Sequence, residues 1–244
     1  MKKSYFFLVK LPVISITVFF LLFLSAVYMF PGSVIEKIGF SSDTYSLTHN
    51  FLSGLGGLKA RGGGSNLTSA LLFNSSLILI GATLVLFYRQ FKEVFIEFQE
   101  DEKTRFYARL TKPVGMIAGV LFAGVGAIPY DLHFEAHVFC AKYAFTTLFF
   151  LSILHTLTIY HSKSMTNRYA LGYVAFCMVL VFYIYLLFCG PAIGPNAEYT
   201  ESDLMLQVIA QKSIVFSFII SILIQVFGFK QAITEGEKRR IGSN

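Results

Sequence analysis

Six stretches of this 244-residue sequence are long and apolar enough to cross a lipid bilayer, and they constrain the fold more than any other feature. The hydrocarbon core of a bilayer is about 30 Å thick, which an α-helix crosses in roughly 20 residues. Lipid offers no partner to a backbone polar group, and the runs are too long for barrel strands, so each should be a helix. The expected spans are residues 8–30, 70–89, 113–130, 135–160, 169–191 and 206–229. The sequence therefore predicts an all-α integral membrane protein, a bundle of six transmembrane helices.

Composition leaves little material for a separate soluble domain. Hydrophobic residues make up 55% of the chain and charged residues only 14%, whereas a soluble domain averages about 25% charged residues. We therefore expect residues 1–230 to form a single transmembrane domain. The net charge of +6 does not indicate a nucleic-acid partner, because the Lys and Arg residues lie in short clusters between the apolar runs.

The distribution of Lys and Arg predicts that both termini are cytoplasmic. If the N-terminus is inside, only Lys37, Lys59 and Arg61 fall in outer segments, and the other Lys and Arg residues between the spans fall inside. This is the bias that the positive-inside rule describes. The charged segment 231–244 is then expected to be a cytoplasmic tail.

Two connecting segments are long enough to need an interpretation. Residues 31–69 form a glycine-rich outer loop, and loops of this length are often functional. Its glycines do not follow a strand, and no Lys-Ser or Lys-Thr pair follows them, so a phosphate-binding loop is not indicated.

Residues 89–112, the second of these segments, mix charged residues with apolar residues at helical spacing. This segment fits either an interfacial helix or an extension of the second span.

Polar residues gather at the outer ends of the expected spans. A polar group inside a bilayer is energetically unfavourable. The insertion free energy of a Lys at the helix centre is about 2.5–3.5 kcal/mol, so each such residue requires an explanation. The topology brings seven of them to the same side, namely His49, Asp131, His133, Glu135, His137, Lys142 and Lys212. This convergence predicts a polar pocket in the outer leaflet.

One interpretation of this pocket is a site for a lipid headgroup or another anion. Lys142 and Lys212 would supply positive charge for a phosphate or carboxylate group. Asp131 and His137 would supply hydrogen bonds, and His49 would close the site from the loop. The alternative for the two lysines is that their side chains snorkel toward the lipid headgroups. Membrane lipids are the expected partners.

A second interpretation is a zinc site. His133 and His137 are four residues apart and share a face if the helix has already begun at His133. With His49 or Asp131 as a third ligand, they would leave a position open for a water molecule, as catalytic zinc requires. The alternative is that both histidines are interfacial groups and that Asp131 caps the fourth span. No other cofactor is indicated.

Small residues recur every four positions in the third span, at Gly115, Gly119 and Ala123. Such a face lets another helix approach closely, either within the chain or in a homo-oligomer.

His155 lies toward the inner end of the fourth span, where a packing role is favoured over a proton relay. The inner half offers few other polar groups, so a small-solute or proton-coupled transporter is the third functional hypothesis.

Three stretches resemble a six-span membrane family, the prokaryotic group of unknown function related to the Frag/DRAM/Sfk-like proteins. The pattern S-x-x-G followed by F-N is matched by Ser46-Leu-Thr-His49-Asn-Phe-Leu-Ser53-Gly-Leu-Gly56 and by Leu72-Phe73-Asn74. Its third-to-fourth-span junction is similar to Gly124-Val-Gly-Ala-Ile-Pro129-Tyr-Asp131 with His137, and its last span to Gln211-Lys212. Because eukaryotic relatives take part in lipid-anchor remodelling, lipid asymmetry and autophagy, the resemblance implies a role on or near lipids.

A second analogy is to the seven-span zinc hydrolases related to alkaline ceramidases and adiponectin receptors. Those proteins gather a Ser, an Asp and three His residues at one membrane face. The corresponding residues here would be Ser46 or Ser53, with His49, Asp131, His133 and His137. This chain departs from them in having six spans and no H-x-x-x-H in the last one. A lipid-associated protein without enzymatic activity is therefore the first hypothesis, and a zinc-dependent lipid hydrolase is the alternative.

Overall fold

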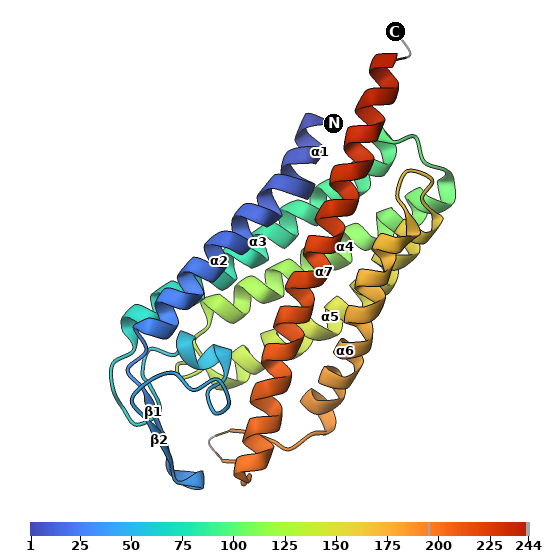
Figure 1. Ribbon diagram of the computed structural model, residues 1–244. Helices are drawn as coiled ribbons and strands as arrows, with labels where there is room; N and C mark the ends of the chain where they lie inside the picture. The colour runs from blue at the N-terminus through green and yellow to red at the C-terminus, as the bar shows by residue number, and fades with distance from the viewer. Residues whose placement is uncertain (195, 243–244) are drawn as a thin grey trace.

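The protein is a bundle of long helices, described by a computed structural model over residues 1–194 and 196–242 (Figure 1). Within these residues, six helices are long and apolar enough to cross a membrane, as the sequence predicted. The first is continuous through α1 (Lys2–Tyr5), the π-helical turn η1 (Phe6–Lys10) and α2 (Leu11–Tyr28). The others are α3 (Leu67–Glu97), α4 (Glu102–Ala127), α5 (Phe134–His161), α6 (Ala170–Cys189) and α7 (Glu201–Gly242). The 3₁₀ turn η4 (Asn167–Tyr169) directly precedes α6.

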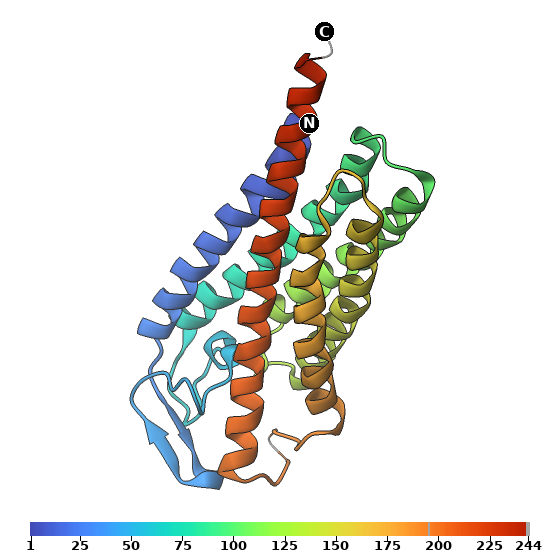
Figure 2. The ribbon, with the colours of Figure 1, turned by 45° about the vertical axis from the view of Figure 1, so that its right-hand side comes forward.

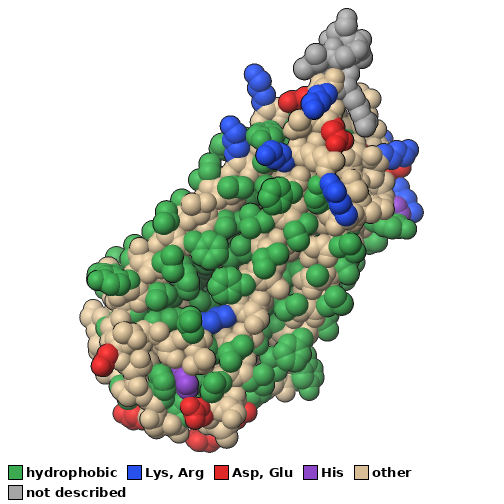
Figure 3. Space-filling model, viewed as in Figure 1, with side chains coloured by type: hydrophobic (Ala, Val, Ile, Leu, Met, Phe, Trp, Pro, Cys, Tyr) green, Lys and Arg blue, Asp and Glu red, His purple; other side chains and the backbone are tan. Residues whose placement is uncertain are grey.

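The two ends of the bundle differ in structure and charge. The N-terminus and the last described turn of α7 lie at one end, here called the terminal end (Figure 1). The opposite end, the hairpin end, carries the antiparallel strands β1 (Ser33–Ile35) and β2 (Phe40–Ser42). On the face drawn in Figure 3, most Lys and Arg side chains gather at the terminal end, Asp and Glu side chains lie at both ends, and a broad apolar belt lies between the two ends. This is the charge asymmetry on which the orientation prediction was based.

Several helices are longer than the apolar runs that predicted them. α3 continues to Glu97, so residues 89–97 extend this helix and do not form a separate interfacial helix. α4 begins at Glu102, before the expected start at residue 113, and the Asp101 side chain caps it by accepting the Thr104 backbone N–H at 2.9 Å. The predicted tail 231–244 is helical through Gly242. Lys, Glu, Gln and Arg are good helix formers, so a helix can continue after its apolar part ends.

The glycine-rich loop 31–69 is folded against one end of the bundle. After β2, residues Leu52–Gly56 form the 3₁₀ turn η3, which packs against α3 and α7 (Figure 2). The buried Asn66 side chain donates hydrogen bonds to the carbonyl groups of Leu55 at 3.1 Å and Gly57 at 2.7 Å. This loop forms one wall of the site described below.

Glycines bring α3 and α4 into backbone contact. A Cβ atom built on Gly119 would lie 2.6 Å from the backbone oxygen of Gly81, and one built on Gly115 would lie 2.1 Å from the Tyr88 ring. A Cβ built on Gly81 would lie 2.5 Å from the backbone nitrogen of Ala123. The small-residue face Gly115/Gly119/Ala123 is therefore covered by α3 within the chain. This is the packing interpretation of the face, and the alternative of a homo-oligomer stays a prediction.

His155 occupies the centre of an aromatic cluster nearer the terminal end. Its side chain is fully buried, and its Nδ1 lies 3.1 Å from the hydroxyl of Tyr88, which in turn lies 2.8 Å from that of Tyr173. The Phe91 ring packs 4.5 Å from the His155 ring, centroid to centroid. The cluster joins α3, α5 and α6 through the two contacts of the Tyr88 hydroxyl, and the buried Nε2 of His155 has no hydrogen-bond partner among the described residues.

Substitution of Gly119 by Val should destabilise the bundle. The new side chain meets the Gly81 backbone, which cannot turn away as a side chain would, and overpacking of this kind costs about 1–3 kcal/mol. That exceeds the gain of a few tenths of a kcal/mol in helix propensity. The unfolding midpoint in detergent measures the effect, with Gly64→Ala as the control because nothing lies within 4 Å of a Cβ there. Equal midpoints for the two variants would contradict the proposed close approach.

Candidate functional site

A cavity of about 390 Å³ lies at the hairpin end, here called the hairpin-end cavity. Its walls come from the outer loop, the α4–α5 connection, α5, the end of α6 and the first turns of α7. Among the described residues, no Asp or Glu lines it. Its main polar and charged side chains are those of His49, Ser53, Arg61, Tyr130, His137, Lys142, Gln207 and Gln211.

The two cations of this cavity come from different walls. Lys142, on α5, has its Nζ 5.0 Å from the centroid of the Phe188 ring. In the described part of the chain, this ammonium group has no carboxylate or hydrogen-bonding partner. Arg61, on the outer loop, lies beside the hydroxyl of Tyr130. Burial raises the pKa of Tyr130 above its ordinary value, so the hydroxyl stays protonated and neutral. The cavity therefore presents positive charge that no lining carboxylate compensates.

His49 lies on the loop wall, the position that the sequence predicted. Its Nε2 lies 2.9 Å from the Glu201 carboxylate at the start of α7. The imidazole ring stacks on Phe40, with the centroids 4.0 Å apart. These contacts hold the loop against α7.

His137 lines the cavity from α5 and is oriented by the chain itself. Its Nδ1 lies 2.7 Å from the carbonyl oxygen of Ile128 in the α4–α5 connection. An Nδ1–H group that donates to this carbonyl leaves Nε2 as a hydrogen-bond acceptor in the neutral ring. His137 is therefore suited to accept a hydrogen bond from a hydroxyl or amine group of a ligand.

Asp131 and Lys212 do not line the cavity, and both fasten the outer loop. Asp131 accepts the backbone N–H groups of Leu58 at 3.1 Å and Lys59 at 2.9 Å. Lys212 donates to the backbone oxygen of Asn50 at 2.5 Å. Asp131 thus caps loop backbone and not the fourth span, and Lys212 is held inside the protein and does not snorkel. The sequence could not reveal these roles, because the partners are backbone groups of a loop without a regular pattern.

The three histidines of the predicted zinc site do not come together. His133 is exposed at the start of α5 and does not line the cavity, while His49 and His137 are engaged by Glu201 and Ile128. Among the residues described by the structure, no three His, Cys, Asp or Glu side chains are arranged to hold a metal ion. The donor set that the metal hypothesis needs is therefore not formed in this conformation.

Comparison with known proteins adds no relative. No family model, curated protein or solved structure matches this chain. The resemblance to the Frag/DRAM/Sfk-like group rests on the quoted motifs alone and stays a prediction. Several of those motif residues fasten the loop: Asn74 donates to the Gly56 carbonyl at 2.9 Å, and Gln211 accepts the Leu52 N–H at 2.7 Å.

Four of the polar lining residues named above, Arg61, Tyr130, Gln207 and Gln211, were not among the predicted site residues. Arg61 was counted only for orientation, yet it is one of just three basic residues in the outer segments, and that rarity was the available signal. Gln207 and Gln211 are four residues apart and share a face of α7. Gln207 also donates to the carbonyls of Leu186 and Pro191, each at 3.1 Å, which fixes the chain after α6.

Substitution of Lys212 by Met should lower stability more than the same change at Lys142. Lys212 is 9% exposed, and its loss removes a charge-assisted hydrogen bond of about 1.5–3 kcal/mol. The Asn50 carbonyl then keeps only the hydrogen bond from the Tyr45 hydroxyl at 3.0 Å. Lys142→Met removes no hydrogen bond within the described residues. Thermal unfolding in detergent compares the two variants. A larger loss for Lys142→Met would contradict the anchoring role of Lys212.

Proposed function

We propose that the hairpin-end cavity binds the anionic headgroup of a membrane lipid. The observation that carries the proposal is the placement of Arg61 and Lys142 on different walls of one cavity that no carboxylate of the described residues lines. A charge without a protein partner in a partly desolvated site attracts an opposite charge strongly. Arg in particular suits the planar, paired oxygens of a phosphate or carboxylate group.

The remaining lining residues support a ligand with hydroxyl or amide groups beside its charge. His137, Gln207, Gln211 and Ser53 offer hydrogen bonds from α5, α7 and the loop. A volume of about 390 Å³ lies in the range of about 300–1,000 Å³ that is typical of small-molecule sites. The cavity therefore suits a compact headgroup better than a single inorganic ion.

The position of the cavity favours a lipid as the source of the headgroup. Six helices are apolar enough to cross a membrane, and the cavity lies at the hairpin end of the apolar belt. With both termini cytoplasmic, as the basic terminal end favours, this depth corresponds to the headgroups of the outer leaflet. In this proposal the protein is a multi-pass membrane protein that binds lipid without catalysing a reaction.

The double variant Arg61→Met/Lys142→Met should lose its preference for anionic lipid. Each charge-assisted hydrogen bond contributes about 1.5–3 kcal/mol, so loss of both should reduce phosphatidylglycerol binding at least about tenfold relative to phosphatidylcholine. Native mass spectrometry of the detergent-purified protein with added lipid measures this ratio.

The matched control is Lys37→Met/Lys59→Met, which removes the same charge from the hairpin end without touching the cavity lining. It should bind phosphatidylglycerol like the wild type. An equal loss in both double variants would assign the effect to general surface charge and overturn the proposal. Stoichiometric zinc in the wild type, lost in His137→Ala, would instead favour the hydrolase alternative.

A further inference from the structure

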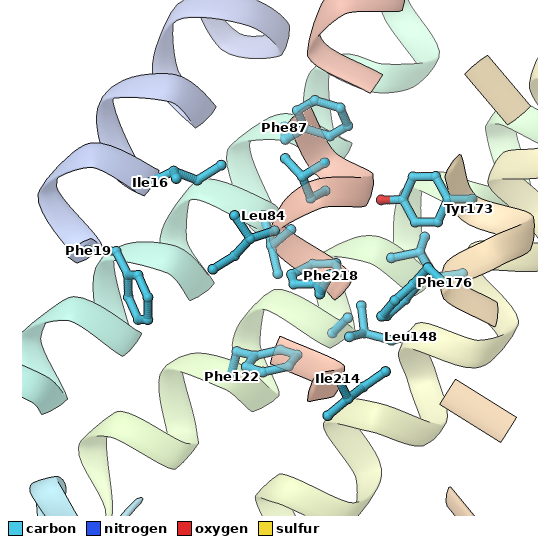
Figure 4. Close-up of a cluster of buried hydrophobic side chains, with 14 of the residues drawn as sticks. Ile16, Phe19, Leu84, Phe87, Phe122, Leu148, Tyr173, Phe176, Ile214 and Phe218 are labelled. Carbon is cyan, nitrogen blue, oxygen red and sulfur yellow. The ribbon is translucent and has the colours of Figure 1, made fainter. Parts of the chain in front are cut away.

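A second cavity adjoins the first and lies between the helices of the bundle. This interhelical cavity has a volume of about 100 Å³ and is lined almost entirely by apolar side chains. They come from α2, α3, α4, α5 and α7, with η3 at one side. Figure 4 shows five of the lining side chains, contributed by four of these helices: Ile16, Phe19, Leu84, Phe122 and Phe218.

The two cavities share part of their walls. Ser53, His137, Ala141 and Gln211 line both of them. Polarity therefore changes across this shared wall, from the cations Arg61 and Lys142 through a few hydrogen-bonding groups to an almost entirely apolar interior. A ligand that matches this change has a charged head, a short polar region and a hydrocarbon tail.

The interhelical cavity lies behind the junction of α2 and α7. Pro12, Ile16 and Phe19 of α2 face it from one side, and Val215, Phe218, Ile219 and Ile222 of α7 from the other. These two helices lie close together near the terminal end and diverge toward the hairpin end in both ribbon views (Figures 1 and 2). Phe20 and Phe216 bridge them, with ring centroids 6.4 Å apart, and Phe216 is 45% exposed. The two rings therefore mark the place where α2 and α7 meet at the surface of the protein.

We propose that the two cavities together bind one lipid molecule, with the end of an acyl chain in the interhelical cavity and access from the bilayer between α2 and α7. This inference rests on the proposed headgroup function. A cavity of about 150 Å³ holds benzene, so about 100 Å³ accommodates a few carbon atoms and not a whole chain. The rest of the chain lies along the α2–α7 junction, next to the lipids around the protein. The chain end would gain packing contacts with the apolar side chains of the interhelical cavity, which a free headgroup cannot make.

The substitution Val215→Phe tests this arrangement, because Val215 lines the interhelical cavity and not the hairpin-end cavity. The added ring should occupy the space of the chain end. We expect phosphatidylglycerol binding to fall about tenfold or more, whereas glycerol phosphate, which has the headgroup but no chain, should bind as it does to the wild type. The matched control is Ile220→Phe, which adds a ring at a position of α7 that is 58% exposed and lines neither cavity.

The outcomes separate this inference from the proposed function. Unchanged lipid binding in Val215→Phe, with binding still lost in Arg61→Met/Lys142→Met, would show that the chain stays outside; it would overturn the inference and leave the headgroup site. Loss of glycerol phosphate as well as lipid in Val215→Phe would also overturn it, because the headgroup site itself would be disturbed. Unchanged binding in every variant would overturn both proposals. If Val215→Phe does not fold, Val125→Phe on α4 fills the same cavity from another wall.

Discussion

The hairpin end depends on side chains that pair the polar backbone of the outer loop. Residues 50–59 lie against helices that are apolar enough for a membrane, where an unpaired N–H or C=O group costs several kcal/mol. No long strand or helix satisfies these groups. Instead, Lys212, Gln211, Asp131 and Asn74 reach them from α7, the α4–α5 connection and α3. The loop can therefore form a fixed wall of the cavity.

These anchors and the cavity lining divide the polar residues of the hairpin end into two groups. Lys212 and Asp131 form hydrogen bonds with backbone groups of the loop. Lys142 and Arg61 face the cavity without a carboxylate. The same residue type thus has opposite roles at positions 142 and 212. The difference depends on whether a backbone carbonyl lies within reach of the ammonium group, and not on depth in the bundle.

The sequence predicted the helices well and the site in part, for reasons that these residues make clear. Long apolar runs specify spanning helices because lipid and backbone hydrogen bonding allow little else. The convergence of His49, His137 and Lys142 on one cavity also followed from topology. The roles of Lys212 and Asp131 did not, because they depend on the conformation of an irregular loop. Arg61 was overlooked because its glycine-rich surroundings gave no sign that they fold into a wall.

The loop anchors also determine when the cavity can form during synthesis. The hydrogen bonds of Gln211 to Leu52 and of Lys212 to Asn50 join residues 159 and 162 positions apart in the chain. At translation rates of about 5–20 residues per second, the loop emerges roughly 8–32 seconds before its partners on α7 exist. During that interval its backbone depends on water or on temporary partners. The binding site is thus completed only after the last helix has been made, so a chain interrupted before α7 keeps most of its apolar helices but lacks an assembled ligand site.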